Sequence, residues 1–143
     1  MTAATSNRKI VEASFHVRFA ETDMMGIVHH ANYLVYFEEG RSEYSRQFGA
    51  PYADLEAMGY SLAVSEARVR FLAPAYYDHL ITVRTWVEDI RSRSITFGYE
   101  VVDGTSGQVL ATGQTKHICV DRSGHVRRIP KEWLKNFEVA AEG

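Results

Sequence analysis

Polar side chains able to act as acids, bases or nucleophiles gather in one short segment, residues 18–33. It contains Asp23 and the pair His29 and His30, and it leads directly into a stretch of helical spacing that begins at Asn32. The first turn of a helix leaves backbone N–H groups unpaired and carries a partial positive charge, so it can stabilise an oxyanion. A carboxylate beside it can attack a carbonyl or deprotonate the attacking water. The pattern therefore favours acyl chemistry, with Asp23 as nucleophile or general base.

Structural roles for the same residues stay open from their spacing alone. Aspartate commonly caps a turn or a helix, and Asp23 could do only that. His30 could be a hydrogen-bonded polar residue at a helix entrance, and His29 a surface histidine. Adjacent residues on a helix or strand point in different directions, so the two histidines form a poor metal site and no metal is expected.

Familiar signatures of other enzyme classes are missing from the sequence. It contains no GxxxxGK[ST], GxGxxG, HExxH, paired CxxC or GxSxG motif. Nucleotide-phosphate loops, dinucleotide sites, zinc proteases and serine hydrolases of the nucleophile-elbow type are therefore disfavoured. Cys119 lies in an apolar run without a cue for activation, which is typical of a core residue.

The hydrophobic pattern predicts the strands and helices that position residues 18–33. Residues 13–20 alternate between apolar and polar side chains, which predicts a first strand, and residues 21–31 keep neither period, which predicts a loop. From Asn32 to Gly49 apolar residues recur every three or four positions, which predicts one long helix. Shorter patterns predict a helical turn within residues 51–59 and another within 130–137.

Four later segments are rich in valine, isoleucine, threonine and aromatic residues, which predicts strands at 61–73, 80–89, 94–102 and 109–120. Their connections are short, and the glycine-containing residues 103–107 suit a hairpin. One strand, one long helix and four strands predict an α+β fold, an antiparallel sheet with the helix on one face. Without a repeat, linker or low-complexity tract, residues 1–143 are expected to form one domain.

Size and composition narrow the function classes further. The chain has 143 residues, of which 45% are hydrophobic and 24% charged, ordinary values for a globular protein. The net charge of -2 gives no basic excess for nucleic acid, and no apolar run is long enough to span a membrane. A single cysteine suits the cytoplasm. Residues 1–10 are small and polar at their start, which predicts a frayed end and not a secretory signal.

The same loop and helix carry a family resemblance. The run Glu21-Thr22-Asp23-Met24-Met25-Gly26-Ile27-Val28-His29-His30-Ala31-Asn32-Tyr33 resembles the signature of the 4-hydroxybenzoyl-CoA thioesterase family, particularly its YbgC-like acyl-CoA branch. The resemblance continues through Tyr36-Phe37-Glu38, Arg41-Ser42-Glu43, the segment 71–78, Leu110-Ala111-Thr112-Gly113 and Val120-Asp121. It covers about residues 15–130.

The resemblance implies a hotdog fold, in which an antiparallel sheet wraps one long central helix and two subunits join their sheets edge to edge. It implies hydrolysis of acyl-CoA thioesters, with the catalytic aspartate at Asp23. The backbone N–H of His30 matches the family's oxyanion donor, and the YbgC-like branch also implicates this imidazole in catalysis. Gly26 matches the family glycine of the turn, and Asn32 and Tyr33 match positions at the helix entrance that help to place the substrate.

A second group matches the part of the family that approaches the coenzyme A nucleotide. Arg91, Ser92, Arg93 and Ser94 lie at a predicted strand connection, and arginine suits phosphate because its planar donors bind two oxygens at once. The alternative is an exposed hairpin tip with two solvated arginines. One departure from the family lies at Phe19, near which some YbgC-like sequences carry a tyrosine hydroxyl.

The sequence therefore predicts a cytoplasmic acyl-CoA thioesterase acting as a homodimer or homotetramer. No cofactor is expected, since coenzyme A belongs to the substrate, and no nucleic acid or membrane partner is expected. Two alternatives stay open: a thioesterase for acyl carrier protein, and a non-catalytic acyl-CoA binding protein. The acyl group, whether aromatic, short and branched or of medium chain length, is not determined by the sequence.

Overall fold

One antiparallel sheet and three α-helices make up the computed structural model, which describes residues 8–142. The sheet has the strand order β1-β3-β4-β5-β2. Its strands are β1 (Val11–His16), β2 (Tyr60–Phe71), β3 (Leu80–Ile90), β4 (Ser94–Asp103) and β5 (Val109–Asp121). The helices are α1 (Asn32–Gln47), α2 (Tyr52–Ala57) and α3 (Lys131–Glu142), and a 3-10 turn, η2, spans Phe19–Glu21.

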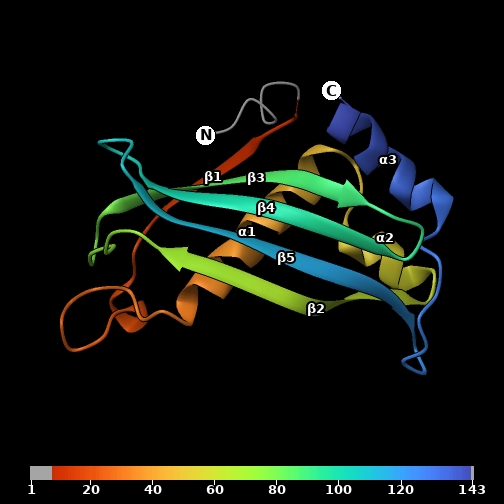
Figure 1. Cartoon of the computed structure of the whole chain (residues 1–143), viewed down its shortest axis with the longest axis horizontal. Coiled ribbons are helices and arrows are strands. Elements are labelled where there is room, and N and C mark those ends of the chain that lie inside the picture. The colour runs from red at the N-terminus through yellow and green to blue at the C-terminus, as the bar shows by residue number, and fades with distance from the viewer. Residues whose placement is uncertain (1–7, 143) are drawn as a thin grey trace.

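The long helix α1 lies behind the sheet in Figure 1 and crosses several of its strands. Its buried face packs on the sheet through aromatic rings: Phe37 stacks on Tyr99 of β4 with ring centroids 4.2 Å apart. Gly40 lets the helix approach β3, because a Cβ there would collide with the side chains of Thr85 and Val83. The predicted α+β fold, with a sheet around one central helix, is confirmed.

The first strand is shorter than predicted. It begins at Val11, two residues before the predicted start, and the predicted alternation holds where Val17 is buried while Ser14 and His16 are exposed. The strand nevertheless ends at His16 and not at Ala20, because the chain turns into η2. Phe19, predicted on the buried side, is 75% exposed as a result.

The C-terminal helix is longer than predicted. In place of a turn within 130–137, α3 runs over Lys131–Glu142. Its first turns are fixed by the core: Phe137 is fully buried, and the indole N–H of Trp133 donates to the Pro51 carbonyl at 3.1 Å. Beyond Phe137 the helix continues through residues 138–142, and alanine and glutamate, which form most of this segment, favour helix.

One edge of the sheet is free, and the helices and the N-terminal segment complete the description of the chain. Strand β2 pairs with β5 on one side, and within the described residues its other edge has no neighbouring strand. None of the helices that the structure describes is both long and apolar enough to cross a membrane. Of the predicted N-terminal end, residues 1–7 lie outside the described part of the chain, and Arg8 forms an ion pair with Glu88 at 2.7 Å.

Candidate active site

The loop before α1 is a small closed hairpin with Asp23 at its neck. Thr22 and Val28 pair as an antiparallel bridge, and the Asp23 N–H donates to the Ile27 carbonyl at 2.9 Å. Asp23 itself is exposed, and its carboxylate accepts one hydrogen bond, from the Met25 N–H at 2.8 Å. The second carboxylate oxygen has no hydrogen-bond donor among residues 8–142. It is therefore free to meet a ligand or water.

Gly26 makes this hairpin possible through its backbone conformation. Its φ is +77°, a region that side-chain-bearing residues rarely adopt, and its N–H donates to the Asp23 carbonyl at 3.0 Å. A Cβ placed on Gly26 would meet nothing within 4 Å. The glycine is therefore required for the turn itself, and in this chain it is not required by a close neighbour.

The helix entrance leaves one backbone donor unused. From His29 to Leu34 every N–H has an acceptor except that of His30, which donates to no atom of residues 8–142. The cap residue Ala31 makes no side-chain cap, and the first turn of α1 contains no acidic residue. The N-terminal charge of the helix thus stays available for an anion.

Both histidines are exposed beside this entrance. Their rings lie with centroids 4.2 Å apart, and the His29 Nδ1 accepts a 3.3 Å hydrogen bond from the Ala31 N–H. The imidazole of His30 therefore faces solvent and neighbours the unused donor of the same residue. Across the part of the chain that the structure describes, no group of three or more His, Cys, Asp or Glu side chains could hold a metal ion.

The side chains of Asn32 and Tyr33 pack within the protein and fix the start of α1. The Asn32 side-chain amide donates to the Glu21 carbonyl at 2.9 Å, which ties α1 to the other side of the hairpin. Tyr33 is buried, and its ring meets that of Phe71 edge to face with centroids 5.1 Å apart. Burial raises the pKa of Tyr33, so its phenol stays protonated. Both residues place the entrance relative to the sheet.

Glu21 is a supporting residue that sequence reasoning missed. Its carboxylate is buried and accepts hydrogen bonds from the Tyr36 hydroxyl at 2.8 Å, the Arg18 N–H at 2.9 Å and the Arg18 Nε at 2.8 Å. Burial raises the pKa of Glu21, but these hydrogen bonds together outweigh burial and hold the pKa below its usual value. No spacing rule links position 21 to position 36 across a loop, so the sequence carried no signal for this contact.

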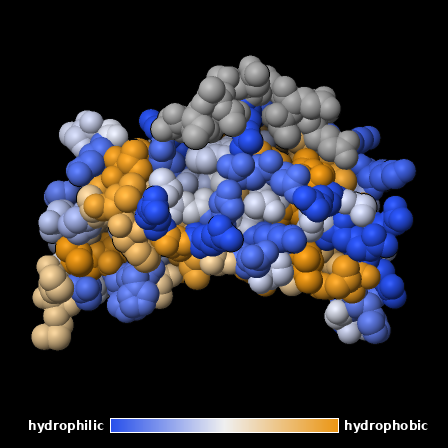
Figure 2. Space-filling view, in the orientation of Figure 1, coloured by the Kyte–Doolittle hydropathy of each residue, from blue (hydrophilic) through white to orange (hydrophobic). Residues whose placement is uncertain are grey.

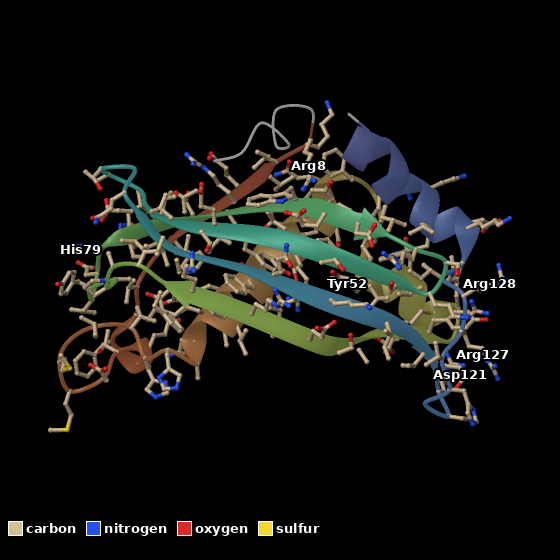
Figure 3. All side chains as sticks on the ribbon, viewed as in Figure 1. Arg8, Tyr52, His79, Asp121, Arg127 and Arg128 are labelled. Carbon is tan, nitrogen blue, oxygen red and sulfur yellow. The ribbon has the colours of Figure 1, made fainter. Side chains whose placement is uncertain are left out.

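Arg91, Arg93 and Ser94 lie at the opposite end of the sheet from Asp23. The hairpin contacts the segment before β3, where the Val28 N–H donates to the Ala75 carbonyl at 2.9 Å, whereas Arg91 follows the end of β3. The eleven residues of β3, which separate the two ends, span about 33 Å. Figure 3 shows the same separation, with His79 at one end and Arg127 and Arg128 at the other. Within one chain the two predicted groups are not brought together.

The arginine end has more positive charge than the sequence indicated. Arg91 and Arg93 are exposed, whereas Ser94 is buried. The segment after β5 runs alongside this turn, because the Ile129 N–H donates to the Ser92 carbonyl at 2.8 Å, and it brings Arg127 and Arg128 to the same end. Two carboxylates neutralise part of this positive charge. Asp89 forms an ion pair with Arg91 and Asp121 forms one with Arg127, each at 2.9 Å.

Apolar side chains surround the Asp23 hairpin on the molecular surface. Figure 2 shows hydrophobic residues gathered at the end of the molecule where this hairpin lies. Met24 and Met25 at the hairpin tip are almost fully exposed, and the ring of Phe19 meets that of Tyr77 edge to face. An exposed carboxylate with apolar side chains around it suits a ligand that has both polar and hydrocarbon parts.

Comparisons with known proteins identify the family and the fold of this chain. Residues 17–137 match the thioesterase-like superfamily. A putative acyl-CoA thioesterase of Bacillus subtilis, YneP, is 33% identical over 135 residues, 92% of this chain and 97% of that protein. A hypothetical protein from Thermus thermophilus superposes with a TM-score of 0.85 at 36% identity, covering 92% of this chain and 97% of the other.

A third protein, DHNA-CoA thioesterase from Staphylococcus aureus, superposes with a TM-score of 0.84 at 29% identity, over 92% of this chain and 87% of that one. The family match covers most of the chain, including the hairpin, α1 and the strands β2 to β5. The predicted hotdog fold and the predicted class of thioester hydrolase are both confirmed. The chain therefore belongs to the thioesterase-like superfamily, as the loop motif predicted from its resemblance to the 4-hydroxybenzoyl-CoA thioesterase family.

Proposed function

We propose that this protein hydrolyses an acyl-coenzyme A thioester to the free acid and coenzyme A. The observation that carries the proposal is an exposed carboxylate, Asp23, on the same hairpin as the unused backbone N–H of His30. The similarity to YneP, a putative acyl-CoA thioesterase, and to a DHNA-CoA thioesterase supports coenzyme A as the carrier. No cofactor enters the proposal, because coenzyme A arrives with the substrate.

Asp23 starts the reaction in one of two ways. As a general base it takes a proton from water while the water oxygen bonds to the thioester carbon. As a nucleophile its own oxygen bonds to that carbon, and water later cleaves the resulting anhydride. In both routes the C–S bond breaks and the coenzyme A thiolate leaves and takes up a proton. The His30 N–H and the helix N-terminus stabilise the oxyanion formed in between.

The other residues of the hairpin hold this arrangement in place. Gly26 supplies the turn that presents Asp23, and Asn32 and Tyr33 fix the helix start against the hairpin and the sheet. The exposed imidazole of His30 is a second candidate for a catalytic group, as a proton donor to the leaving thiolate. Its backbone and side-chain roles are separable by mutation, because Ala keeps the N–H.

Binding of the coenzyme A phosphates by Arg91 and Arg93, with Ser94 supporting the turn, requires a second subunit. These residues lie about 33 Å along the sheet from the hairpin of their own chain. Antiparallel pairing of two β2 edges would turn the partner's β3–β4 end toward this chain's hairpin. Exposed apolar residues beside that edge, Leu34, Val35 and Val64 among them, support a homodimer, with a homotetramer as the larger alternative. We place the enzyme in the cytoplasm, where the free thiol of Cys119 is stable.

Thiol release from a panel of acyl-CoAs by purified wild type and Asp23→Asn tests the proposal. The variant is well matched, since the Asn side-chain oxygen can still accept the Met25 N–H that Asp23 accepts. Turnover should fall by about 10²–10⁴-fold with thermal unfolding unchanged, because the attacking charge is lost. His30→Ala should lose less, since its backbone donor survives.

Three other results would change the assignment. Near-normal turnover by Asp23→Asn would remove Asp23 from the mechanism. Hydrolysis of acyl carrier protein thioesters alone would change the carrier and keep the chemistry. Tight acyl-CoA binding without thiol release from either carrier would make the protein a binding protein.

A further inference from the structure

His29 is a polar residue of the hairpin to which the proposed mechanism gives no role. Its backbone N–H donates to the Glu21 carbonyl at 2.9 Å, which fixes its main chain to the other side of the hairpin. Its side chain is exposed at the entrance of α1 and makes two contacts there, one with a backbone N–H and one with a neighbouring ring. Each contact bears on a group that the proposed reaction uses.

The first contact decides which backbone donor stays free. The His29 Nδ1 accepts the Ala31 N–H at 3.3 Å, a bond between a side chain and the second residue along the chain that is typical of turns. A ring nitrogen that accepts carries no proton, so the proton of the neutral ring lies on Nε2. No other group of residues 8–142 accepts the Ala31 N–H. His29 therefore leaves one free donor at the helix entrance, that of His30, in place of two adjacent ones.

The second contact limits where the His30 imidazole can lie. The two rings have centroids 4.2 Å apart and planes inclined by 32°. Within the part of the chain that the structure describes, the His30 ring makes no hydrogen bond and meets no other aromatic ring. An exposed side chain without contacts samples several rotamers. The His29 ring covers one face of the His30 ring and thereby removes some of these positions.

We propose that His29 is a positioning residue for thioester hydrolysis and acts through both groups of His30. Its Nδ1 holds the entrance of α1 so that the His30 N–H alone is presented to the oxyanion. Its ring holds the His30 imidazole beside that donor. Both arrangements exist before substrate arrives, and donors fixed in advance stabilise a transition state without having to reorganise. This inference rests on the proposed thioesterase function and adds a residue that acts without touching the substrate.

Three substitutions of His29 separate the two contacts. His29→Phe keeps a ring and removes the acceptor, His29→Asn keeps an acceptor for the Ala31 N–H and removes the ring, and His29→Ala removes both. All three variants should fold, because the side chain is exposed. His16→Ala is the matched control: His16 is also exposed, lies in β1 and makes no side-chain hydrogen bond with residues 8–142.

Nuclear magnetic resonance measures the ring positions without substrate. In protein with isotope-labelled histidine, the ring current of His29 should shift the ring protons of His30 upfield, with His30→Ala identifying the signals. The upfield shift should persist in His29→Phe and disappear in His29→Asn and His29→Ala. Equal His30 shifts in wild type and His29→Ala would show that the rings do not stack, which would overturn the inference whatever the activity.

Steady-state kinetics on the acyl-CoA that wild type hydrolyses best measure the effect on the reaction. His29→Ala should lower kcat by about three- to tenfold and change KM by less than about twofold, because the displaced groups act on the transition state. His29→Phe and His29→Asn should each recover part of kcat, and His16→Ala should equal wild type.

A double-mutant cycle assigns the two contacts to the two groups of His30. In a His30→Ala background, His29→Asn should cost nothing further, because no imidazole is left to be stacked. In the same background His29→Phe should still lower kcat, because the Ala31 N–H has lost its acceptor. A full further loss with His29→Asn would show that His29 does not act through the His30 ring, and it would overturn the inference.

Failure of this inference and failure of the proposed function give different results. Wild-type kcat in His29→Ala would overturn the inference and leave the thioesterase intact. An equal loss in all three His29 variants would make this imidazole a catalytic group, and a raised KM at unchanged kcat would make it a substrate-binding group. Both results would overturn the positioning role. Absence of thiol release by wild type from every thioester would overturn the proposed function and this inference with it.

Discussion

The carboxylate of Glu21 accepts a hydrogen bond from the hydroxyl of Tyr36 at 2.8 Å and thereby joins the hairpin that carries Asp23 to the second turn of α1. The same glutamate holds Arg18, and its backbone carbonyl accepts from the His29 N–H and the Asn32 amide, each at 2.9 Å. One buried residue thus connects the end of β1, both sides of the hairpin and the helix start. The position of Asp23 relative to α1 depends on it.

Glu21→Gln should reduce stability in a pH-dependent way. The folded pKa of Glu21 lies below its unfolded value of 4.5, so the charge stabilises the fold above that pH. At pH 7 the variant should lose about 1–3 kcal/mol of unfolding free energy, because a buried charged hydrogen-bond acceptor is replaced. The loss should shrink as pH falls below about 4.5, measured by urea denaturation across that range.

Glu43→Gln is the control for this comparison. Glu43 is also three residues from an arginine, Arg46, but on the outer face of α1. Its substitution should change stability by less than about 0.5 kcal/mol, since exposed ion pairs contribute little. Equal effects of the two substitutions would show that Glu21 does not organise the hairpin.

Gly26→Ala should damage activity more than stability. The backbone at φ +77° costs a side-chain-bearing residue about 1–2 kcal/mol, while the added Cβ meets no neighbour. The hairpin should relax and misplace Asp23, so kcat should fall strongly while the unfolding temperature falls by only several degrees. Gly26→Asn should retain more activity than Gly26→Ala, because asparagine tolerates this conformation better. The reverse order would show that space, and not backbone conformation, requires glycine.

His117 should make the folded protein less stable in mild acid, at pH values higher than those at which carboxylates titrate. Its folded pKa of about 3 lies below its unfolded value of 6.5, so the unfolded chain takes up the proton first as pH falls. Wild type should lose stability steadily below about pH 6.5, by up to about 1.4 kcal/mol per pH unit. His117→Asn should show a flatter profile between pH 6.5 and 4, whereas the exposed His125→Asn should follow wild type.

Phe137→Ala should test whether α3 belongs to the core. Phe137 is fully buried against the rings of Tyr44, Phe97 and Trp133. Its truncation should cost about 3–5 kcal/mol, the range for a buried aromatic residue, measured by urea denaturation. Lys135→Ala, on the exposed side of the same helix, should change stability little. A small effect of Phe137→Ala would mean that α3 adds nothing to the fold's stability.

Local pattern was sufficient for most of the fold. The long helix from Asn32 follows from apolar periodicity, and the four later strands follow from their content of β-branched and aromatic residues, since both signals lie within a short segment. The first strand and the last helix differ most from the prediction. Phe19 continues the strand pattern, but the chain turns into η2, where the Glu21 side chain accepts from the Arg18 N–H. Helix α3 extends beyond the apolar residues on which its prediction rested.

The sequence by itself determined the family and the segment proposed to carry the chemistry, because Asp23, Gly26 and His30 lie close together along the chain in one motif. Only the tertiary structure showed that Glu21 meets Tyr36 and that Arg91 lies a full strand away from Asp23. Both relations join residues far apart in sequence. They depend on strand register and helix placement, which arise from the packing of the whole chain.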